Sequence, residues 1–170
     1  LEDLAANYEG FYNSVKVIMK EAKKGSVSGI CGPVSQLISV PSQYNVAMEV
    51  ALGAKMQNIV TLTDEDAKRA IKTLKQLDAG RATFLPLTTI KGRTLDEKGL
   101  DDCYGYIGIA SELCSCDKKY DNIKSSLLGK IVVAEDLNSA ATMAKKYGYR
   151  FMIVTLDGQV VNAGGSLTGG

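Results

Sequence analysis

The residues that most often do chemistry in proteins are scarce in this chain. Its 170 residues include no histidine, so it has no Ser-His-Asp triad, no Cys-His pair and no His-ligated metal. The four cysteines are Cys31, Cys103, Cys114 and Cys116, and the one close pair is spaced Cys-x-Cys, which is too short for a structural zinc site. We expect reduced thiols and no metal, although the count alone leaves disulfides open.

Acidic side chains form two clusters, at residues 64–66 and at Asp101-Asp102. Carboxylates alone are compatible with Mg²⁺ binding or hydrolysis. However, Asp64 and Asp66 follow Thr63 at the start of a helical pattern, where acidic residues are favoured by the exposed N–H groups. We therefore interpret the first cluster as a helix cap.

The segment Gly164-Gly-Ser-Leu-Thr-Gly-Gly170 is unusually rich in glycine. A phosphate-binding loop would require the lysine of G-x-x-x-x-G-K-[ST] and a following helix, and the segment shows neither. Two interpretations remain. The segment is a flexible tail, or its paired glycines allow another backbone to approach a strand edge, as in self-association through Gly164, Gly165, Gly169 and Gly170.

Basic side chains gather in two stretches of an otherwise balanced chain, which has 20 basic and 19 acidic residues. Residues 68–93 contain seven bases and one acid, and a second group precedes Gly25. The expected DNA contacts are Lys72, Lys75, Lys91 and Arg93, followed by Lys20, Lys23 and Lys24. Such contacts would bind phosphates with little sequence preference. The alternative is that both stretches are solvated helix faces.

The N-terminal residues show the pattern of a coiled coil. Apolar residues separated by gaps of three and four predict a coiled-coil arm over residues 1–24 that stops at Gly25. We expect no partner helix within the chain, so the partner would be another chain or sequence beyond Gly170. The alternative is an amphipathic helix packed on the domain. The seam is formed by Leu1, Leu4, Tyr8, Phe11, Val15, Ile18 and Ala22.

The rest of the chain has an α/β pattern. We expect strands at 59–62, 82–85, 131–133, 151–156 and 159–161, with a type I′ turn at Asp157-Gly158. Helices are expected at 44–53, after Thr63, and after a cap at Asp136. The residues expected to face inward are Ala67, Ala70, Ile71, Leu74 and Leu77 in one helix, and Leu137, Ala140, Ala141 and Ala144 in another.

Strand-helix-strand occurs twice, each time after Leu-Gly, at Gly53 and at Gly129. This echo predicts a mixed α/β fold of two pseudo-repeated lobes, with two unrelated βαβ units as the alternative. The predicted divisions are a coiled-coil arm end (1–24), lobe I (25–90), a connecting region (91–126) and lobe II with the glycine-rich edge (127–170). The connecting region is irregular and acidic, and it has a possible short strand at 106–110.

Several segments together resemble the hinge domain of structural maintenance of chromosomes (SMC) proteins, in its bacterial form. The motifs are Tyr8-Glu-Gly-Phe11, Gly32-Pro-Val-Ser-Gln-Leu-Ile-Ser-Val40, the segment from Tyr44 to Gly53, Gly80-Arg-Ala-Thr-Phe-Leu-Pro-Leu87, Leu127-Leu-Gly129, Ile153-Val-Thr-Leu-Asp-Gly158 and the glycine-rich segment. One departure is Ala163, where relatives often have proline.

The resemblance implies a homodimerisation domain that is not an enzyme and binds no cofactor itself. ATP and Mg²⁺ would be bound by ATPase heads at the ends of two coiled-coil arms. The arms and heads would form a ring that entraps DNA, with kleisin-type subunits at the heads. The expected location is cytoplasmic and chromosome-associated, with no membrane partner. The alternatives from the residues are a DNA-binding module that does not dimerise and a small-ligand α/β enzyme that uses Asp or Cys.

Overall fold

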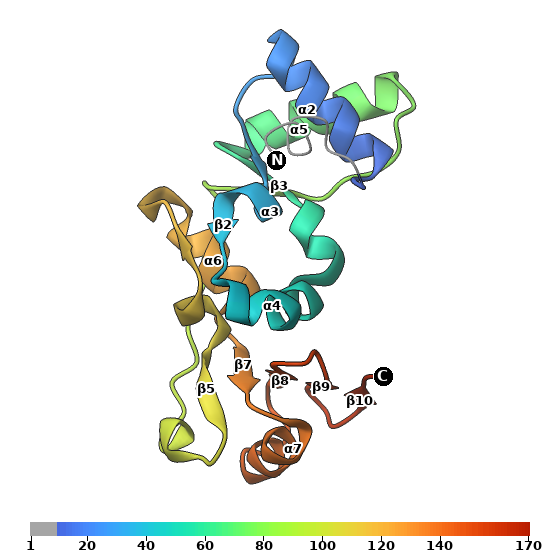
Figure 1. Cartoon of the computed structure of the whole chain (residues 1–170). Coiled ribbons are helices and arrows are strands. Elements are labelled where there is room, and N and C mark those ends of the chain that lie inside the picture. Colours follow the sequence, from blue (N-terminus) through green and yellow to red (C-terminus); the bar gives the residue numbers. More distant parts are fainter. Residues whose placement is uncertain (1–9) are drawn as a thin grey trace. The chain divides into compact units, whose positions relative to one another are not determined.

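The structure, a computed structural model, describes residues 10–170 and contains two compact units. Unit 1 comprises the chain up to Ile38 together with Ala54–Ile90, and unit 2 comprises Ser39–Gly53 together with Lys91–Gly170. The chain therefore crosses from one unit to the other three times. Figure 1 follows it from α2 in unit 1 to β10 in unit 2.

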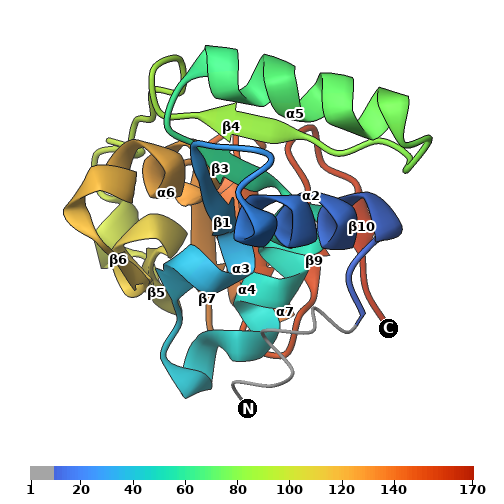
Figure 2. The same ribbon diagram turned by 90° about the horizontal axis from the view of Figure 1, so that it is seen from above.

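Unit 1 is a three-stranded sheet with two longer helices. The strand order is β1-β3-β4, in which β3 runs antiparallel to β1 and parallel to β4. Helix α5 lies along β4 and also contacts α2 (Figure 2). The elements are α2 (Asn13–Lys24), β1 (Ile30–Pro33), the single-turn α3 (Val34–Leu37), β3 (Ile59–Thr61), α5 (Asp64–Gln76) and β4 (Phe84–Pro86).

Helix α2 differs from the predicted coiled coil. It begins at Asn13, after a turn at Gly10 with a φ of +82°. Val15 and Ile18, which the pattern assigned to a seam, are buried in the core of unit 1, and α5 is a partner helix within the chain. For residues 13–24 the coiled-coil prediction is therefore wrong, and the amphipathic helix packed on the domain is correct. The first three seam positions lie outside the described residues.

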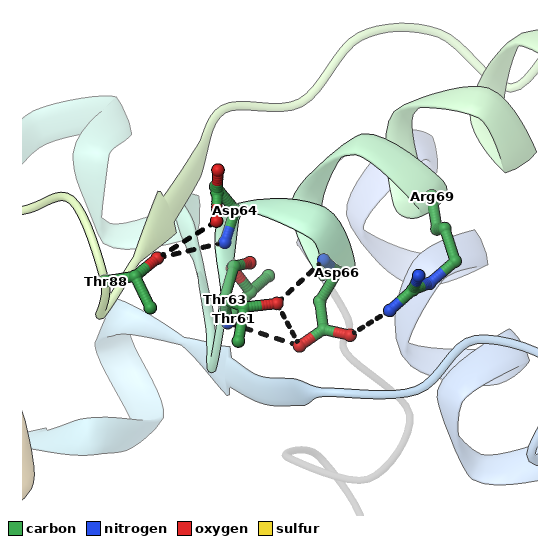
Figure 3. Close-up of polar contacts among 6 residues, drawn as sticks. All are labelled: Thr61, Thr63, Asp64, Asp66, Arg69 and Thr88. Carbon is green, nitrogen blue, oxygen red and sulfur yellow. Dashed lines mark hydrogen bonds and ion pairs between the residues drawn. The ribbon is translucent and has the colours of Figure 1, made fainter.

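The cap of α5 is as predicted (Figure 3). Thr63 Oγ1 accepts the backbone N–H of Asp66 at 3.1 Å, and the Asp66 carboxylate accepts the backbone N–H of Thr63 at 3.2 Å. This reciprocal pair is a capping box, which satisfies two N–H groups that the first turn of a helix leaves free. The acidic cluster at 64–66 therefore serves the helix, as we interpreted it from the sequence.

The buried face of α5 is narrower than predicted. Ala67, Ala70 and Leu74 are buried, but Ile71 and Leu77 are 53% and 52% exposed. The three buried residues form one stripe along the helix, at i, i+3 and i+7. A sheet of only three short strands covers no more than this stripe, and α5 lies over its outer strand β4.

Unit 2 is a five-stranded sheet in the order β10-β9-β8-β7-β5, in which only β7 and β8 are parallel. Helix α7 contacts β7, β8 and β9, and α4 contacts β8 and α6 (Figure 1). The elements are α4 (Asn45–Leu52), β5 (Tyr106–Ile109), β6 (Ser115–Cys116), α6 (Asp121–Leu128), β7 (Ile131–Ala134), α7 (Leu137–Lys146), β8 (Met152–Thr155), β9 (Val160–Val161) and β10 (Leu167–Thr168). The short β2 (Ile38–Ser39) spans the junction between the units.

The predicted pseudo-repeat is present and extends further than the Leu-Gly echo. In each unit the central strand, β3 or β7, has an antiparallel neighbour, β1 or β5, and a parallel neighbour, β4 or β8, reached through one helix. Strand β1 and helix α4 recur 76 positions later as β5 and α6, and β2 recurs 77 positions later as β6. The residues identical at this spacing are Gly29/Gly105, Gly32/Gly108, Ser35/Ser111, Leu37/Leu113, Ser39/Ser115, Tyr44/Tyr120, Leu52/Leu128 and Gly53/Gly129.

The division of the chain differs from the predicted one at two places. Residues 91–126, predicted as a connecting region, belong to unit 2 and supply its edge strand β5. Residues 39–53, predicted within lobe I, also belong to unit 2, where α4 contacts β8. The reason in both cases is packing: helix and strand patterns identify elements but do not specify which core buries them.

Two local predictions in unit 2 need correction. At Asp157-Gly158 only the glycine has a positive φ, +87°, and its N–H donates to the carbonyl of Thr155 at 2.9 Å. The predicted type I′ turn, which needs two positive φ values, is therefore wrong, and the loop ends in a left-handed glycine instead. In α7, Leu137 is exposed, while Met143 is buried because it lies one turn from Ala140 on the face toward the sheet.

Candidate self-association edge and basic surface

The two larger sheets each have two outer strands, and these strands differ in how well another strand could pair with them. Strands β1 and β5 both contain a register irregularity, near Gly32 and Gly108. Such bulges twist an edge and discourage pairing. Strands β4 and β10 pair with their neighbours in continuous register. These two strands are therefore the edges best suited to accept a strand from another molecule.

Strand β10 forms a hairpin with β9 and presents its outer side to solvent. Leu167 pairs with Val161, and the N–H of Asn162 donates to the carbonyl of Ser166 at 2.8 Å. Since hydrogen-bonded and non-hydrogen-bonded pairs alternate in an antiparallel ladder, the N–H and C=O of Leu167 point away from β9. The Leu167 side chain is 63% exposed. An unpaired backbone next to an exposed apolar side chain is what a docking strand requires.

The four predicted interface glycines flank this strand and have different roles. Gly164 and Gly165 have φ values of +91° and +106° and form the turn that connects β9 to β10. Gly170 also has a positive φ, and its N–H donates to Gln159 Oε1 at 3.0 Å. At Gly169 a Cβ would displace the amide end of the Gln159 side chain, which accepts the N–H of Gly170. The glycines thus determine the conformation of the β9–β10 hairpin. Leu167, which lies between the two glycine pairs, has its backbone groups and side chain exposed at the edge.

Strand β4 presents a complementary edge in unit 1. The carbonyl of Thr83 accepts from Ile59 N–H and the N–H of Leu87 donates to Thr61, each at 2.9 Å, so these alternate residues face β3. Phe84 and Pro86 therefore direct their backbone groups to the free side. Proline, which has no N–H, is expected in a strand only at such an edge. Phe84 thus supplies the N–H that a docking strand could use.

The predicted basic residues do not all belong to one unit. Lys72 and Lys75 lie exposed on α5, and Lys20, Lys23 and Lys24 lie exposed on α2, all in unit 1. Lys91 and Arg93 are also exposed but belong to unit 2. The structure therefore brings the lysines of α2 and α5 into one unit, and it does not add Lys91 and Arg93 to that unit.

Ion pairs reduce the free positive charge of unit 1. Lys68 pairs with Glu65 at 3.1 Å, Arg69 pairs with Asp66 at 2.8 Å, and Lys24 pairs with Glu21 at 3.4 Å. Lys72 and Lys75 take part in no ion pair found in the described part of the chain. These two lysines are consequently the cations of α5 most available to an anionic ligand.

The cysteines form no site in residues 10–170. All four are free, and burial raises the pKa of the Cys114 thiol to about 11, so it stays protonated at neutral pH. Within the same residues no three acidic or cysteine side chains are grouped closely enough to hold a metal ion. No helix among them is long and apolar enough to cross a membrane.

Comparison with known families agrees with this geometry. Residues 27–144 match the family model described as "SMC proteins Flexible Hinge Domain". The chain belongs to the SMC hinge domain family. This hinge is 43% identical, over its whole length, to the chromosome partition protein Smc of Bacillus subtilis, of which it spans 14%. A relative with the same name from Lactiplantibacillus plantarum is 39% identical over the whole hinge.

Solved structures give the same assignment. The hinge is similar to the asymmetric dimer of the Geobacillus stearothermophilus SMC hinge domain, with 43% identity and a TM-score of 0.94 over 99% of this chain and 69% of that one. The Pyrococcus furiosus SMC hinge domain matches with 29% identity and a TM-score of 0.76, over 99% of this chain and 84% of that chain. The predicted mixed α/β hinge fold is confirmed.

Two residues of the candidate edges, Leu167 and Phe84, were not among the predicted site residues. Both lie inside motifs that carried the family resemblance. A usable signal was available for Phe84, because Pro86 two residues later indicates an edge strand. For Leu167, the flanking glycine pairs suggested an edge without showing which residue faces outward.

Proposed function

We propose that this hinge domain joins two copies of its protein into a homodimer through the free edge of β10. The observation that carries the proposal is Leu167, whose backbone groups point away from β9 and whose side chain is exposed. The related Geobacillus stearothermophilus hinge domain, of the same fold, is described as a dimer. As a hinge domain the chain is not itself catalytic.

Two kinds of edge allow a closed dimer. If β10 of one copy pairs with β4 of the other, a two-fold axis repeats the contact and leaves neither edge free. Each contact is short, because β10 has two residues and β4 three. The dimer would need both contacts. Because each copy contributes its β10 to one of them, a single substitution in β10 weakens both contacts.

The test measures solution mass by light scattering for Leu167→Lys and for Leu137→Lys. Leu137 is a matched control, since it is another exposed leucine of unit 2 and it belongs to α7 rather than to an edge strand. The wild type and the control should have twice the mass of the chain, and Leu167→Lys should shift toward the monomer with an unchanged circular dichroism spectrum. A Leu167→Lys variant with dimer mass would overturn the proposed interface.

Replacing all four glycines by alanine is a second perturbation, which tests the conformation of the edge rather than its outer surface. Three of them have positive φ, where a side chain costs about 1 kcal/mol or more each. The quadruple variant should lose the dimer because the β9–β10 hairpin is strained. It therefore tests the shape of the edge, whereas Leu167→Lys tests its outer surface.

The wider role is part of the same proposal. The hinge would connect two coiled-coil arms whose ATPase heads bind ATP and Mg²⁺, and the resulting ring would entrap DNA for chromosome condensation and segregation. Kleisin-type subunits would bind the heads, and the protein would be cytoplasmic and chromosome-associated. The support is the name of relatives that are about seven times longer, chromosome partition protein Smc.

We also propose weak, non-specific DNA binding by the lysines of α2 and α5. Its support is the exposed, unpaired Lys72 and Lys75 together with the lysines at the end of α2. Lys91 and Arg93 would contribute a separate contact from unit 2. Mobility shifts of duplex DNA should weaken steeply with salt, because binding releases condensed counterions.

The decisive DNA experiment reverses the charge of Lys72 and Lys75 and compares this variant with one reversed at Lys91 and Arg93. Both should keep the dimer mass. The first variant should lose most of the mobility shift at low salt, and the second should lose less. Equal binding by the first variant and the wild type would exclude the α5 surface.

A further inference from the structure

Unit 2 contains an open hollow that neither the edge nor the basic surface explains. It lies between α7 and the loop that precedes β5, has a volume of about 480 Å³, and its surface is mostly apolar. Tyr104, which is 86% exposed, stands at its rim, and Cys103, Thr142 and Met143 line it. A large aromatic side chain exposed beside an apolar hollow is characteristic of protein-binding surfaces.

The loop that carries Tyr104 is held on both sides of this residue by contacts with residues that flank α7. Tyr147 Oη donates to the carbonyl of Lys98 at 2.7 Å, Arg150 pairs with Glu97, and the N–H of Glu135 donates to the carbonyl of Gly105 at 2.8 Å. Hence the hollow is already formed in the free domain, and a ligand would lose little binding energy in ordering it.

Acidic side chains lie in the hollow and next to its lining residues in the sequence. Asp136 lines it directly, and Glu135, the preceding residue, extends its carboxylate toward Gly105, next to Tyr104. Asp101 and Asp102 are exposed directly before Cys103. These four carboxylates take part in none of the ion pairs found in residues 10–170. The pKa of Asp136 is lowered by the N–H of Ser139, so it remains ionised at neutral pH.

The charges decide which ligand fits. Among the described residues that line the hollow, one is acidic, Asp136, and one is basic, Lys146, whose ammonium lies 4.0 Å from Cys103 Sγ. With Glu135, Asp101 and Asp102 next to the lining residues in the sequence, carboxylates outnumber this ammonium, which disfavours nucleic acid phosphates. A bound metal ion is also a poor fit, because the carboxylates nearby are not grouped to hold one. An apolar surface beside carboxylates that take part in none of the ion pairs found in residues 10–170 is complementary to a cationic polypeptide.

We propose that this hollow binds a basic peptide segment of a partner protein, with an apolar side chain placed beside Tyr104 and flanking Arg or Lys residues paired with Asp101, Asp102, Glu135 and Asp136. This site is distinct from the β10 edge and from the lysines of α2 and α5. It would let the hinge recruit a partner without occupying either surface of its proposed function.

The experiment uses three fluorescein-labelled probe peptides, Arg-Arg-Leu-Arg-Arg, Arg-Arg-Ser-Arg-Arg and Glu-Glu-Leu-Glu-Glu, each flanked by Gly-Ser. Fluorescence anisotropy with the whole chain should give a dissociation constant below about 1 mM for the first peptide and weaker binding for the other two. Tyr104→Ser should weaken binding about tenfold and Glu135→Lys about threefold. The matched control is Glu49→Lys, an exposed acid on α4, which makes the same change in net charge and should change binding less than twofold.

Several results would overturn the proposal. They are the absence of binding by the Leu peptide at 1 mM, equal binding of the Leu and Ser peptides, and wild-type affinity in both Tyr104→Ser and Glu135→Lys. Light scattering of the same variants separates this site from self-association. A change of mass in Tyr104→Ser would make the hollow an interface between copies, whereas unchanged mass together with lost peptide binding supports a separate site.

Discussion

Replacing Asp66 by Asn tests whether a buried carboxylate at the start of α5 stabilises unit 1. Asp66 is 6% exposed, and its two oxygens accept from three donors: the Thr63 N–H at 3.2 Å, Thr63 Oγ1 at 2.9 Å and Arg69 at 2.8 Å. A Cβ on Gly29 would overlap the carboxylate, so this side chain is closely packed. Asn keeps the size of the side chain and removes its charge.

The expected loss is about 2 kcal/mol. Weakening a cap costs about 1 kcal/mol, losing a negative charge at a helix N-terminus costs about 0.5 kcal/mol, and losing an ion pair with the largely exposed Arg69 costs about 0.5 kcal/mol. For a chain of this length, 2 kcal/mol corresponds to a fall in Tm of about 4–8 °C. Glu65→Gln is the control, because Glu65 is exposed and pairs only with exposed Lys68. It should change the free energy of unfolding by less than about 0.5 kcal/mol.

The effect should also depend on pH in one direction. Hydrogen bonds from Thr63, followed by the Arg69 guanidinium, lower the pKa of Asp66 below its ordinary value of 3.8, against the opposing effect of burial. A lowered pKa stabilises the folded state above the unfolded pKa, and this stabilisation is lost as the pH falls through the folded pKa. The difference between wild type and Asp66→Asn should therefore be full at pH 7 and shrink below pH 3.8.

Urea unfolding followed by circular dichroism, at one protein concentration, measures this difference at pH 7 and pH 3. Equal stability of wild type and variant at pH 7 would refute the capping argument. A deficit of the same size at both pH values would show that packing, rather than charge, accounts for the loss.

Two further predictions concern packing. Ile18→Ala should destabilise the domain by about 3 kcal/mol because Ile18 is fully buried in unit 1, whereas Ile71→Ala should cost less than about 1 kcal/mol; similar losses in urea unfolding would contradict the observed helix faces. Gly129→Ala should cost about 2 kcal/mol or more and displace the backbone at Arg93, whose carbonyl oxygen a Cβ would overlap. Gly53→Ala should cost about 1–2 kcal/mol through its φ of +54° alone, and hydrogen exchange near Arg93 should increase in the first variant only.

The repeat shows how much of the fold was open to prediction. The Leu-Gly echo led to two α/β lobes, and the topology of the two sheets agrees. The stronger signal, eight identities at a constant spacing of 76, was also in the sequence but was scattered among residues that differ. Because it covers β5 and α6, it would have placed residues 105–129 in the second repeat rather than in a connecting region.

Local features of this hinge were determined by the sequence itself. These features depend on residues only a few positions apart, so a short stretch of sequence is enough to predict them. They are the caps at Thr63 and Asp136, the helix stop at Gly25 and the strands at 59–61 and 131–134. The same holds for the family, whose motifs are short and contiguous.

The partners of each surface were decided only by the tertiary structure. Val15 and Ile18 are apolar in either case, and burial against α5 rather than a second chain depends on contacts some 50 residues apart. Leu167 could equally have pointed its backbone toward β9, because a shift of one residue in register reverses every group along a strand. Strand order and register arise from hydrogen bonds between distant segments, and for this reason the free edges appear only in the folded chain.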